Sequence, residues 1–293
     1  MLLLAPVVAR AQTTLVLQPG PAVGRDLSLS FDGSTLNRGA SDDLEGYGDF
    51  QRVALLWFDL SSVPGGASCT SADLTLWYLS VEPDVVAVPG RAWTAYELLP
   101  ANGGWIEGTG FGGPTAPGES DRMWIISPTS RWASGDTVYG FNSADVDSTP
   151  LATFPVPNLP LPGDAISFSL PCSVVERWFG PTPQNPGIGL TVNEYTGIVS
   201  AHHLVSSDHL DSTRWPRLSV TYLASPPPDG GASGGDGGVE NNALGPMTFT
   251  VGCACQGTPI DPSILGAMAL LPWLRRRTRA TGDRRDRLAP SRT

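Results

Sequence analysis

The amino-acid sequence predicts an all-β fold, a β-sandwich of the jelly-roll type with one short helix. Glycine and proline are abundant, at 34 and 28 of 293 residues, and only 16% of the residues are charged. Many short apolar runs are separated by turn-forming residues, and long helical periodicities are nearly absent. A chain of this length can bury one large core or two small ones. We therefore expect a sandwich over residues 12–224.

The segment before it, residues 1–11, has the features of a signal peptide. An apolar run ends at Val8, and Ala9-Arg10-Ala11 fits the small-x-small pattern of a cleavage site. The run is short and lacks a positively charged start, which fits a signal peptide truncated at its beginning. An ordinary first strand is the alternative. The signal-peptide interpretation predicts export.

An acidic loop follows two short strands that are expected at 14–17 and 27–31. It contains Asp42, Asp43 and Glu45, with glycines close by. Oxygen ligands on a flexible loop suit Ca²⁺, which accepts roughly six to eight of them in loose geometry. These three residues are therefore candidate ligands of a structural Ca²⁺. Their spacing does not match an EF-hand loop, and a solvated acidic loop is the alternative.

The stretch from Arg52 to Leu79 holds the central pair of strands. Val53 to Leu60 is apolar on both alternating faces, which is typical of a strand covered on both sides. A turn at 64–66 follows, and from Ala72 apolar and polar residues alternate as in a half-buried strand. Trp77 falls on the outer face of that strand. It is a candidate for stacking on a flat ligand such as a sugar ring.

Regularity fades between Thr109 and Pro160, a stretch rich in glycine, proline, serine and threonine. A loop of that length in a compact domain is usually functional or mobile. It contains Trp124 and Trp132, which join Trp77 as candidate ligand-stacking residues. For Trp124 and Trp132, packing within the core or the loop is the alternative.

The remaining elements are short strands and the single helix. Strands are expected at 91–98, 166–170, 188–192, 199–204 and 217–222. The helix is expected over Ser173–Phe179, with Ser173 as the N-cap and Glu176 completing a capping box. Gly180-Pro181 should end it.

Several of these motifs resemble those of one domain family. The stretch LLWFDLSSVPGGASCTSADLTLWY closely resembles the signature of the DNRLRE domain family. Four further segments also resemble motifs of this family: Asn37-Arg38-Gly39, Trp105-Ile106-Glu107, Ser206-Ser207-Asp208 and Arg217–Tyr222. The similarity covers residues 15 to 222 and is weak across 109–160. It implies a β-sandwich module of secreted and surface proteins, akin to some carbohydrate-binding modules.

Cysteine positions and charge fit an exported protein. Cys69 and Cys172 lie in the expected sandwich, and export makes a disulfide between them plausible. Two separate buried thiols are the alternative. Residues 12–224 contain 9 arginines against 22 acidic residues. This balance argues against nucleic acid as a partner, because phosphate binding needs clustered positive charge.

Two segments of a different kind follow the sandwich. Residues 225–246 form a linker that should be disordered, because it cannot bury enough apolar surface to offset its ordering entropy. Residues 247–293 contain Cys253 and Cys255, a short hydrophobic run at 264–274 and then an arginine cluster. This order resembles the MYXO-CTERM sorting signal. The resemblance implies cleavage near Cys253 by a sortase-like protease and display on the cell surface, with a lipid on cysteine as one means of attachment. A retained weak anchor and a disordered tail are the alternatives.

The sequence offers no strong catalytic motif. It contains neither G-x-S-x-G nor a phosphate-binding loop. A transition-metal site is conceivable where histidines and carboxylates gather, at His202, His203, Asp208, His209 and Asp211. However, adjacent residues on a strand point to opposite faces. We therefore prefer surface histidines at the end of a strand.

These observations predict a non-catalytic module of the cell surface, the outer membrane or the extracellular space. We expect it to bind polysaccharide or matrix, or to act as a structural or adhesive module, with no cofactor other than a structural Ca²⁺. Membrane contact should occur only through the C-terminal tail or a lipid. A carbohydrate-active enzyme with carboxylates at the sandwich rim is one alternative, and a purely structural protein without a ligand is another.

Overall fold

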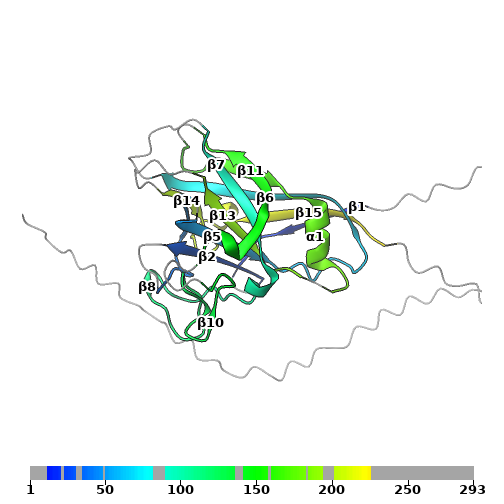
Figure 1. The fold of residues 1–293 in the computed structure, drawn as a ribbon. Coiled ribbons are helices and arrows are strands. Elements are labelled where there is room, and N and C mark those ends of the chain that lie inside the picture. The colour runs from blue at the N-terminus through cyan, green and yellow to red at the C-terminus, as the bar shows by residue number, and fades with distance from the viewer. Residues whose placement is uncertain are drawn as a thin grey trace, which may run out of the picture. The chain divides into compact units, whose positions relative to one another are not determined.

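The computed structural model describes residues 12–20, 23–30, 35–48, 50–81, 90–135, 141–157, 160–182, 184–193 and 201–225. Within these residues the chain forms the predicted jelly-roll-type β-sandwich, with antiparallel sheets and one α-helix (Figure 1). No helix among them is long and apolar enough to cross a membrane. The predicted signal peptide, the linker after Ser225 and the sorting tail with Cys253 and Cys255 lie outside the described residues.

One layer is a six-stranded antiparallel sheet, here called the first sheet. It contains β1 (Gln12–Leu17), β4 (Asp43–Gly46), β6 (Ser68–Val81), β12 (Ala165–Ser169), β14 (His202–Val205) and β15 (Arg217–Leu223). The strand order is β1–β15–β6–β14–β4, and β12 also pairs with β6. The long strand β6 is central, because β15 pairs with its first part and β14 with its end.

The other layer is a five-stranded antiparallel sheet, here called the second sheet. It contains β2 (Gly24–Ser30), β5 (Arg52–Phe58), β7 (Ala92–Leu98), β11 (Val146–Pro155) and β13 (Ile188–Val192). The strand order is β11–β7–β13–β5–β2. The strand β5 therefore lies between two others, as its apolar sequence predicts.

The main core fills the space between the two sheets. Leu74 and Leu76 of β6 pack in one cluster with Leu56 and Phe58 of β5. The helix α1 (Cys172–Phe179) adds Trp178 to this cluster. The alternation that the sequence predicts for β5 and β6 is confirmed here, because alternate residues of each strand line one shared interior.

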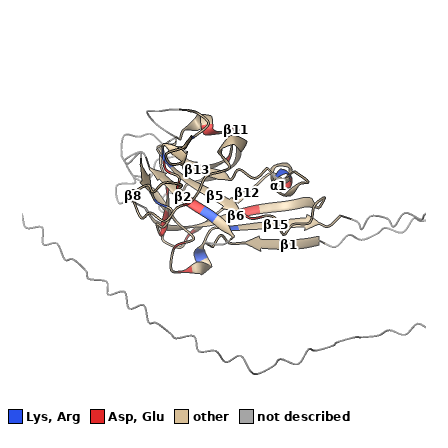
Figure 2. Ribbon diagram, turned by 90° about the horizontal axis from the view of Figure 1, so that it is seen from below, with Lys and Arg blue, Asp and Glu red and all other residues tan. Residues whose placement is uncertain are grey.

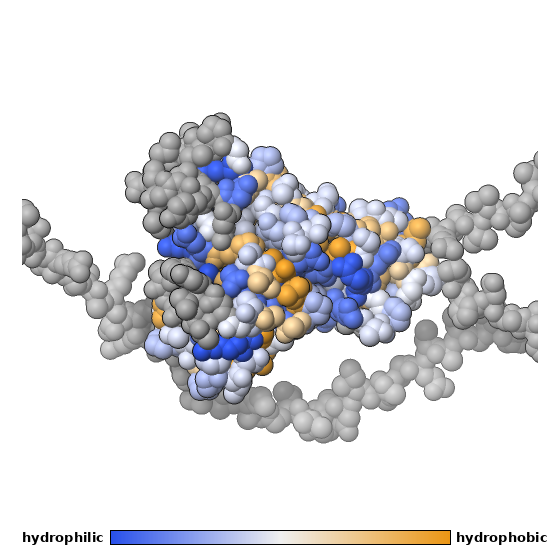
Figure 3. Space-filling view, viewed as in Figure 1, coloured by the Kyte–Doolittle hydropathy of each residue, from blue (hydrophilic) through white to orange (hydrophobic). Residues whose placement is uncertain are grey.

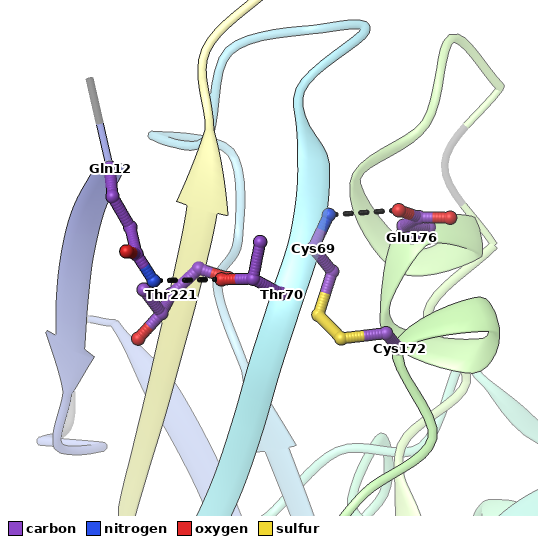
Figure 4. The surroundings of a disulfide bond; sticks show 6 residues. All are labelled: Gln12, Cys69, Thr70, Cys172, Glu176 and Thr221. Carbon is purple, nitrogen blue, oxygen red and sulfur yellow. Dashed lines mark hydrogen bonds between the residues drawn. A yellow bond between two sulfur atoms is a disulfide. The ribbon is translucent and has the colours of Figure 1, made fainter. Parts of the chain in front are cut away.

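A disulfide links α1 to the first sheet (Figure 4). Cys172, the first residue of α1, is bonded to Cys69 on β6, which confirms the predicted pairing. The carboxylate of Glu176 accepts a hydrogen bond from the backbone N–H of Cys69 at 2.8 Å. Glu176 therefore does not complete the predicted capping box. The N-cap is Pro171, without a side-chain hydrogen bond, and the predicted N-cap Ser173 lies inside the helix.

A second, smaller core lies on the outer face of the second sheet. Val53 and Leu55 of β5 belong to it, opposite the face that lines the main core. Residues 99–135 and 141–146, here called the covering segment, supply large side chains that pack there: Trp105, Ile125, Trp132 and Phe141. The segment also holds β8 (Gly113–Pro114), β9 (Trp124–Ile126) and β10 (Ser130–Arg131). The expected irregular stretch is therefore largely a packed layer, and it continues into the strand β11, which the sequence did not predict.

Asn37, on β3 (Leu36–Asn37), attaches the covering segment to the sandwich. It is fully buried, and its side-chain amide donates to the carbonyl oxygens of Glu107 at 2.7 Å and Ser120 at 2.8 Å. Its side-chain oxygen accepts from the backbone N–H groups of Gly39 at 3.1 Å and Gly110 at 2.7 Å. The Asn-x-Gly step therefore has a structural role, because one side chain satisfies polar groups of two segments.

Candidate functional site

Over β1, β15, β6 and β12, the outer face of the first sheet is not covered by any described element. Along β1, β15, β6 and β12, inward residues line the main core and the residues between them point outward. Twelve of these outward residues, here called the open face, are Thr14, Val16, Ser71, Asp73, Thr75, Trp77, Ala165, Ser167, Ser169, Arg217, Ser219 and Thr221. Most of them carry a hydroxyl group, and only Asp73 and Arg217 are charged. The uncharged strand β1 is seen in Figure 2.

Polar side chains of neighbouring strands bond to one another across the open face. The pairs are Thr14 with Thr221 at 3.1 Å, Thr75 with Ser167 at 3.4 Å, and Ser169 with Asp73 at 2.8 Å. At the start of β1, the amide of Gln12 donates to the hydroxyl of Thr70 at 3.1 Å (Figure 4). These bonds restrict the side chains, and each hydroxyl keeps further capacity to bond a ligand.

The three predicted ligand-stacking tryptophans do not share one surface. Trp77 is half-buried on the open face, and the guanidinium of Arg217 lies 5.2 Å from the centre of its ring. Trp124 belongs to the covering segment, on the opposite side of the sandwich. There the guanidinium of Arg131 lies 3.7 Å from its ring centre. Both rings are therefore partly occupied by cation–π contacts.

Trp132 is a core residue and is not available to stack on a ligand. Only 2% of it is exposed, and it packs edge-to-face against Phe141 with 4.9 Å between the ring centres. Its indole N–H donates to the carbonyl oxygen of Asp121 at 2.9 Å. The packing alternative is therefore correct for this tryptophan.

The stretch expected as an acidic loop is instead the edge strand β4. Asp43 lies beside His203 of β14, with 2.5 Å between the carboxylate and the ring nitrogen Nδ1. Glu45 is buried and pairs with two arginines, Arg38 at 2.9 Å and Arg52 at 3.3 Å. Burial raises the pKa of the Glu45 carboxyl, and the nearby arginines oppose that rise.

Two of the three predicted Ca²⁺ ligands, Asp43 and Glu45, lie in this cluster, and Ca²⁺ binding stays a prediction. Asp43, Glu45 and His203 each offer a ligand atom within 4.8 Å of the others. Ca²⁺ prefers oxygen ligands with uncompensated negative charge, whereas here two arginines already neutralise Glu45. The third predicted ligand, Asp42, is exposed and is not among the clustered residues. We interpret the cluster as an ion-paired network.

A second cluster of carboxyl groups lies where the covering segment meets the sandwich. Asp26 of β2, Glu107 of the covering segment and Asp208 after β14 each place an oxygen within 4.8 Å of the others. Glu107 and Asp208 line a cavity of about 590 Å³, together with Arg25. Asp26 is 1% exposed and accepts a hydrogen bond from the backbone N–H of Ser207 at 2.7 Å.

Burial and mutual repulsion favour the protonated form of these carboxyl groups. Burial raises the pKa of Asp26 to about 7, against a weaker opposing effect of its hydrogen bonds from Ser207. Burial, with the charges of Asp26 and Asp208, raises the pKa of Glu107 to about 8. Burial also raises the pKa of Asp208. The cluster can therefore hold a proton near neutral pH, which is a property of acid–base groups in active sites.

Arg25 is held beside this cluster by two aromatic rings. Its guanidinium carbon lies 4.5 Å from the ring centre of Trp57 and 4.7 Å from that of Trp105. It also donates to the carbonyl oxygen of Trp105. Burial lowers the pKa of Arg25, and the charge of Glu107 opposes this. The cavity therefore presents one cation, Arg25, and three carboxyl groups, because Glu119 lines it beside Glu107 and Asp208.

The histidines do not meet at a common metal site. His202 is fully buried, neither of its ring nitrogens has a hydrogen-bond partner among the described residues, and burial lowers its pKa to about 4. His203, on the opposite face of β14, pairs with Asp43. His209 accepts a hydrogen bond from the backbone N–H of Asp211 at 3.0 Å. The expectation that His202 and His203 point to opposite faces is confirmed.

The carboxyl cluster is the site that sequence reasoning missed. Glu107 and Asp208 each fall in a stretch that resembles the family pattern, but nothing in the sequence brings them together. Asp26 directly precedes the apolar alternation of β2, and no spacing marks it as a site residue. Only the packing of three distant segments creates the cluster.

The described surface has scattered large apolar residues. They are Val16, Val23, Ile106, Phe111, Leu161 and Leu210. On the side seen in Figure 3, hydrophobic residues form small groups among hydrophilic ones. Single exposed apolar side chains are normal for soluble proteins, so they do not by themselves mark a site.

Comparison of the chain with models of known protein families gave no match, and neither did comparison with curated protein sequences. Function is therefore inferred from the residues and their geometry.

Proposed function

We propose that this protein is a non-catalytic, surface-displayed module that binds polysaccharide through the open face of the first sheet. The observation that carries the proposal is the contrast between this sheet and the second one. The second sheet is covered on its outer face over β2 and β5, whereas the first exposes hydroxyl groups and Trp77 to solvent. Hydroxyl groups pair well with sugar hydroxyls, because each acts as both donor and acceptor.

Export and display belong to the same proposal. The disulfide between Cys69 and Cys172 supports export, because disulfides persist mainly in oxidising compartments. The proposed tail processing involves a sortase-like protease acting near Cys253. Mass spectrometry of the protein isolated from cells should find an N-terminus after Ala11 and a C-terminus near Cys253. An intact chain in the cytoplasm would contradict this part of the proposal.

Binding is tested by incubating the purified sandwich domain with a panel of polysaccharides and measuring the unbound fraction. We expect Trp77→Ala to weaken binding at least threefold. Trp124→Ala is the matched control, because Trp124 also lies under an arginine but on the opposite side of the sandwich. Equal losses in both variants would mean that the open face is not the binding site. Binding of no polysaccharide would contradict the function itself.

A second candidate function is hydrolysis of a glycan in the carboxyl-lined cavity. Retaining glycosidases hold two carboxyl groups about 5–5.5 Å apart, and inverting enzymes hold them farther apart. The close oxygens of Glu107 and Asp208 are nearer to the retaining arrangement. In that mechanism Glu107, whose pKa is raised to about 8, would act as the acid and Asp208 as the nucleophile. Asp26 would be a positioning residue.

Turnover assays separate the two candidates. Hydrolysis of a polysaccharide that disappears in both Glu107→Gln and Asp208→Asn would establish the enzyme. Binding that persists without release of sugar, and that neither substitution weakens, would support the non-catalytic module. We favour the module, because the sequence carries no catalytic motif for the cavity.

A further inference from the structure

We infer that the open face binds the surface of an ordered, uncharged polysaccharide, in which many chains lie side by side, in preference to a single soluble chain. This inference rests on the proposed function and narrows it to one class of ligand. Four properties of the open face support it: its two-dimensional extent, its fixed hydroxyl groups, its partly covered tryptophan and its low charge.

The first property is extent. Four adjacent strands, β1, β15, β6 and β12, contribute outward residues to one continuous sheet surface. Neighbouring strands lie about 4.8 Å apart, and outward residues on one strand repeat about every 6.8 Å. The hydroxyl groups therefore form a grid across the sheet. A single sugar chain would contact one row of this grid, whereas an ordered surface would contact several rows at once.

The second property is rigidity. Hydrogen bonds join side chains of neighbouring strands: one bond joins β1 to β15, and two join β6 to β12. Each bond to a ligand only replaces a bond to water, so its net contribution is small. Small contributions sum effectively when neither partner loses much conformational freedom on binding. A rigid polysaccharide surface meets this condition, and a flexible chain does not.

The third property concerns aromatic stacking. A single sugar chain is best held by an exposed aromatic ring that covers the flat side of a sugar. Trp77 is the aromatic residue of the open face, and Arg217 already lies over its ring at 5.2 Å. The open face therefore has no fully free aromatic platform for one chain. Its remaining contacts are spread over hydroxyl groups.

The fourth property is charge complementarity. The chain has a formal net charge of −10, yet the open face carries one acidic residue and one basic residue. Asp73 accepts a hydrogen bond from Ser169, and Arg217 lies over Trp77. A face of near-zero charge on an acidic protein suits an uncharged ligand. A polyanion would be repelled by the rest of the chain.

The inference is tested with ordered and soluble probes of the same chemistry. Microcrystalline cellulose and α-chitin serve as ordered probes, and cellohexaose and chitohexaose as soluble ones. We expect at least one ordered probe to deplete the domain from solution, and the matching hexasaccharide to bind at least tenfold more weakly in calorimetry. Alginate, a polyanion, should bind no better than the hexasaccharides.

The site is tested by placing charge in the middle of the grid. Thr75→Glu and Ser219→Glu introduce carboxylates on β6 and β15 and should each reduce the amount bound to the ordered probe at least fivefold. Thr153→Glu is the matched control, because Thr153 is an exposed threonine on β11, an edge strand of the second sheet. Circular dichroism and thermal unfolding establish that all three variants are folded.

The outcomes separate the inference from the proposed function. If a hexasaccharide binds as tightly as the ordered probe, or if alginate binds best, the inference is wrong and polysaccharide binding stands. If the ordered probe binds but the grid variants behave like Thr153→Glu, the open face is not the site and the inference is again wrong. If neither ordered nor soluble polysaccharide binds, the proposed function fails as well.

Discussion

The two sheets of the sandwich differ in what lies on their outer faces. In the second sheet, the outward residues Leu27, Leu29, Val53 and Leu55 are fully buried beneath the covering segment. In the first sheet, the outward residues are mainly serine and threonine, and no described element covers them. In both sheets, alternate residues face the core that the two sheets share. The kind of side chain at the outward positions therefore determines whether a third layer forms, and the uncovered sheet is left available for a ligand.

The largest effect on stability should come from removing a large side chain that is buried on the covered outer face of the second sheet. Trp105 is fully buried, contacts the guanidinium of Arg25 and donates its indole N–H to the carbonyl oxygen of Pro186 at 3.2 Å. We expect Trp105→Ala to lower the free energy of unfolding by about 3–5 kcal/mol, because it removes a large buried side chain and leaves a cavity. Urea-induced unfolding measures this change.

The control on the open side is Trp77→Ala. Trp77 is half-buried, and strand residues on a solvent-exposed face typically differ in stability by about 1 kcal/mol or less. If Trp77→Ala lowered the free energy of unfolding as much as Trp105→Ala, the outer face of the first sheet would contribute to stability as much as the covered face of the second sheet.

The next effect concerns the covalent bond that ties α1 to the uncovered sheet. The disulfide between Cys69 and Cys172 joins residues 103 positions apart. Replacing both cysteines with alanine should lower the free energy of unfolding by about 2–4 kcal/mol, chiefly because the unfolded chain gains freedom. The measurement is urea unfolding of the double variant and of the oxidised and reduced wild type. A change below about 1 kcal/mol would mean that the sheet does not depend on this link.

The main sandwich could be predicted from the sequence because its central strands have simple apolar patterns. Ala72–Tyr78 shows the period of two of a half-buried strand and lies in β6, whereas Val53–Leu60 is apolar on both faces and contains most of β5, which is buried on both sides. The strand β11 could not be predicted in this way. It contains Pro150 and Pro155, and most of its residues are exposed or half-buried, so apolar alternation does not mark it. Its pairing with β7 at the sheet edge determines its conformation.

The sites were less predictable, because they depend on contacts between distant segments. The acidic residues 42–45 suggest a loop that binds Ca²⁺, but Arg38, Arg52 and His203 supply partners that local spacing cannot reveal. Trp132 lies in a glycine- and proline-rich stretch typical of a loop, yet it is buried because the outer face of the second sheet is apolar. The prediction that Trp77 lies on an outer face is confirmed, because alternation within one strand is a local property.

The third prediction concerns pH and the junction between the covering segment and the sandwich. Asp26 faces Glu107 and Asp208, with Arg25 nearby, and burial raises its pKa to about 7. Between pH 4 and pH 7 the unfolded chain loses the Asp26 proton while the folded protein keeps it. The free energy of unfolding should therefore fall as pH rises, by at most about 1.4 kcal/mol per pH unit for one proton. Asp26→Asn should reduce this decrease.

The measurement is urea unfolding of wild type and Asp26→Asn at pH 4, 5.5 and 7. The variant should gain stability relative to wild type as the pH rises. A difference that is the same at pH 4 and pH 7 would mean that Asp26 does not retain its proton. His202 acts in the opposite direction, because burial lowers its pKa to about 4 and its contribution is lost as pH falls below about 6.5. His202 is present in both proteins and cancels in the comparison.

The smallest effect on stability should come from the open face. Thr75→Val keeps the β-branched shape that suits a strand and removes only a hydroxyl group, which bonds Ser167 at 3.4 Å. Because this bond is exposed to water, we expect the free energy of unfolding to change by less than about 0.5 kcal/mol. Thermal and urea unfolding of wild type and variant provide the measurement. A loss above about 1 kcal/mol would mean that the hydroxyl pairs stabilise the fold. A negligible loss combined with weaker binding to an ordered polysaccharide would mean that these side chains serve a ligand, which is the difference expected between an open face and a covered one.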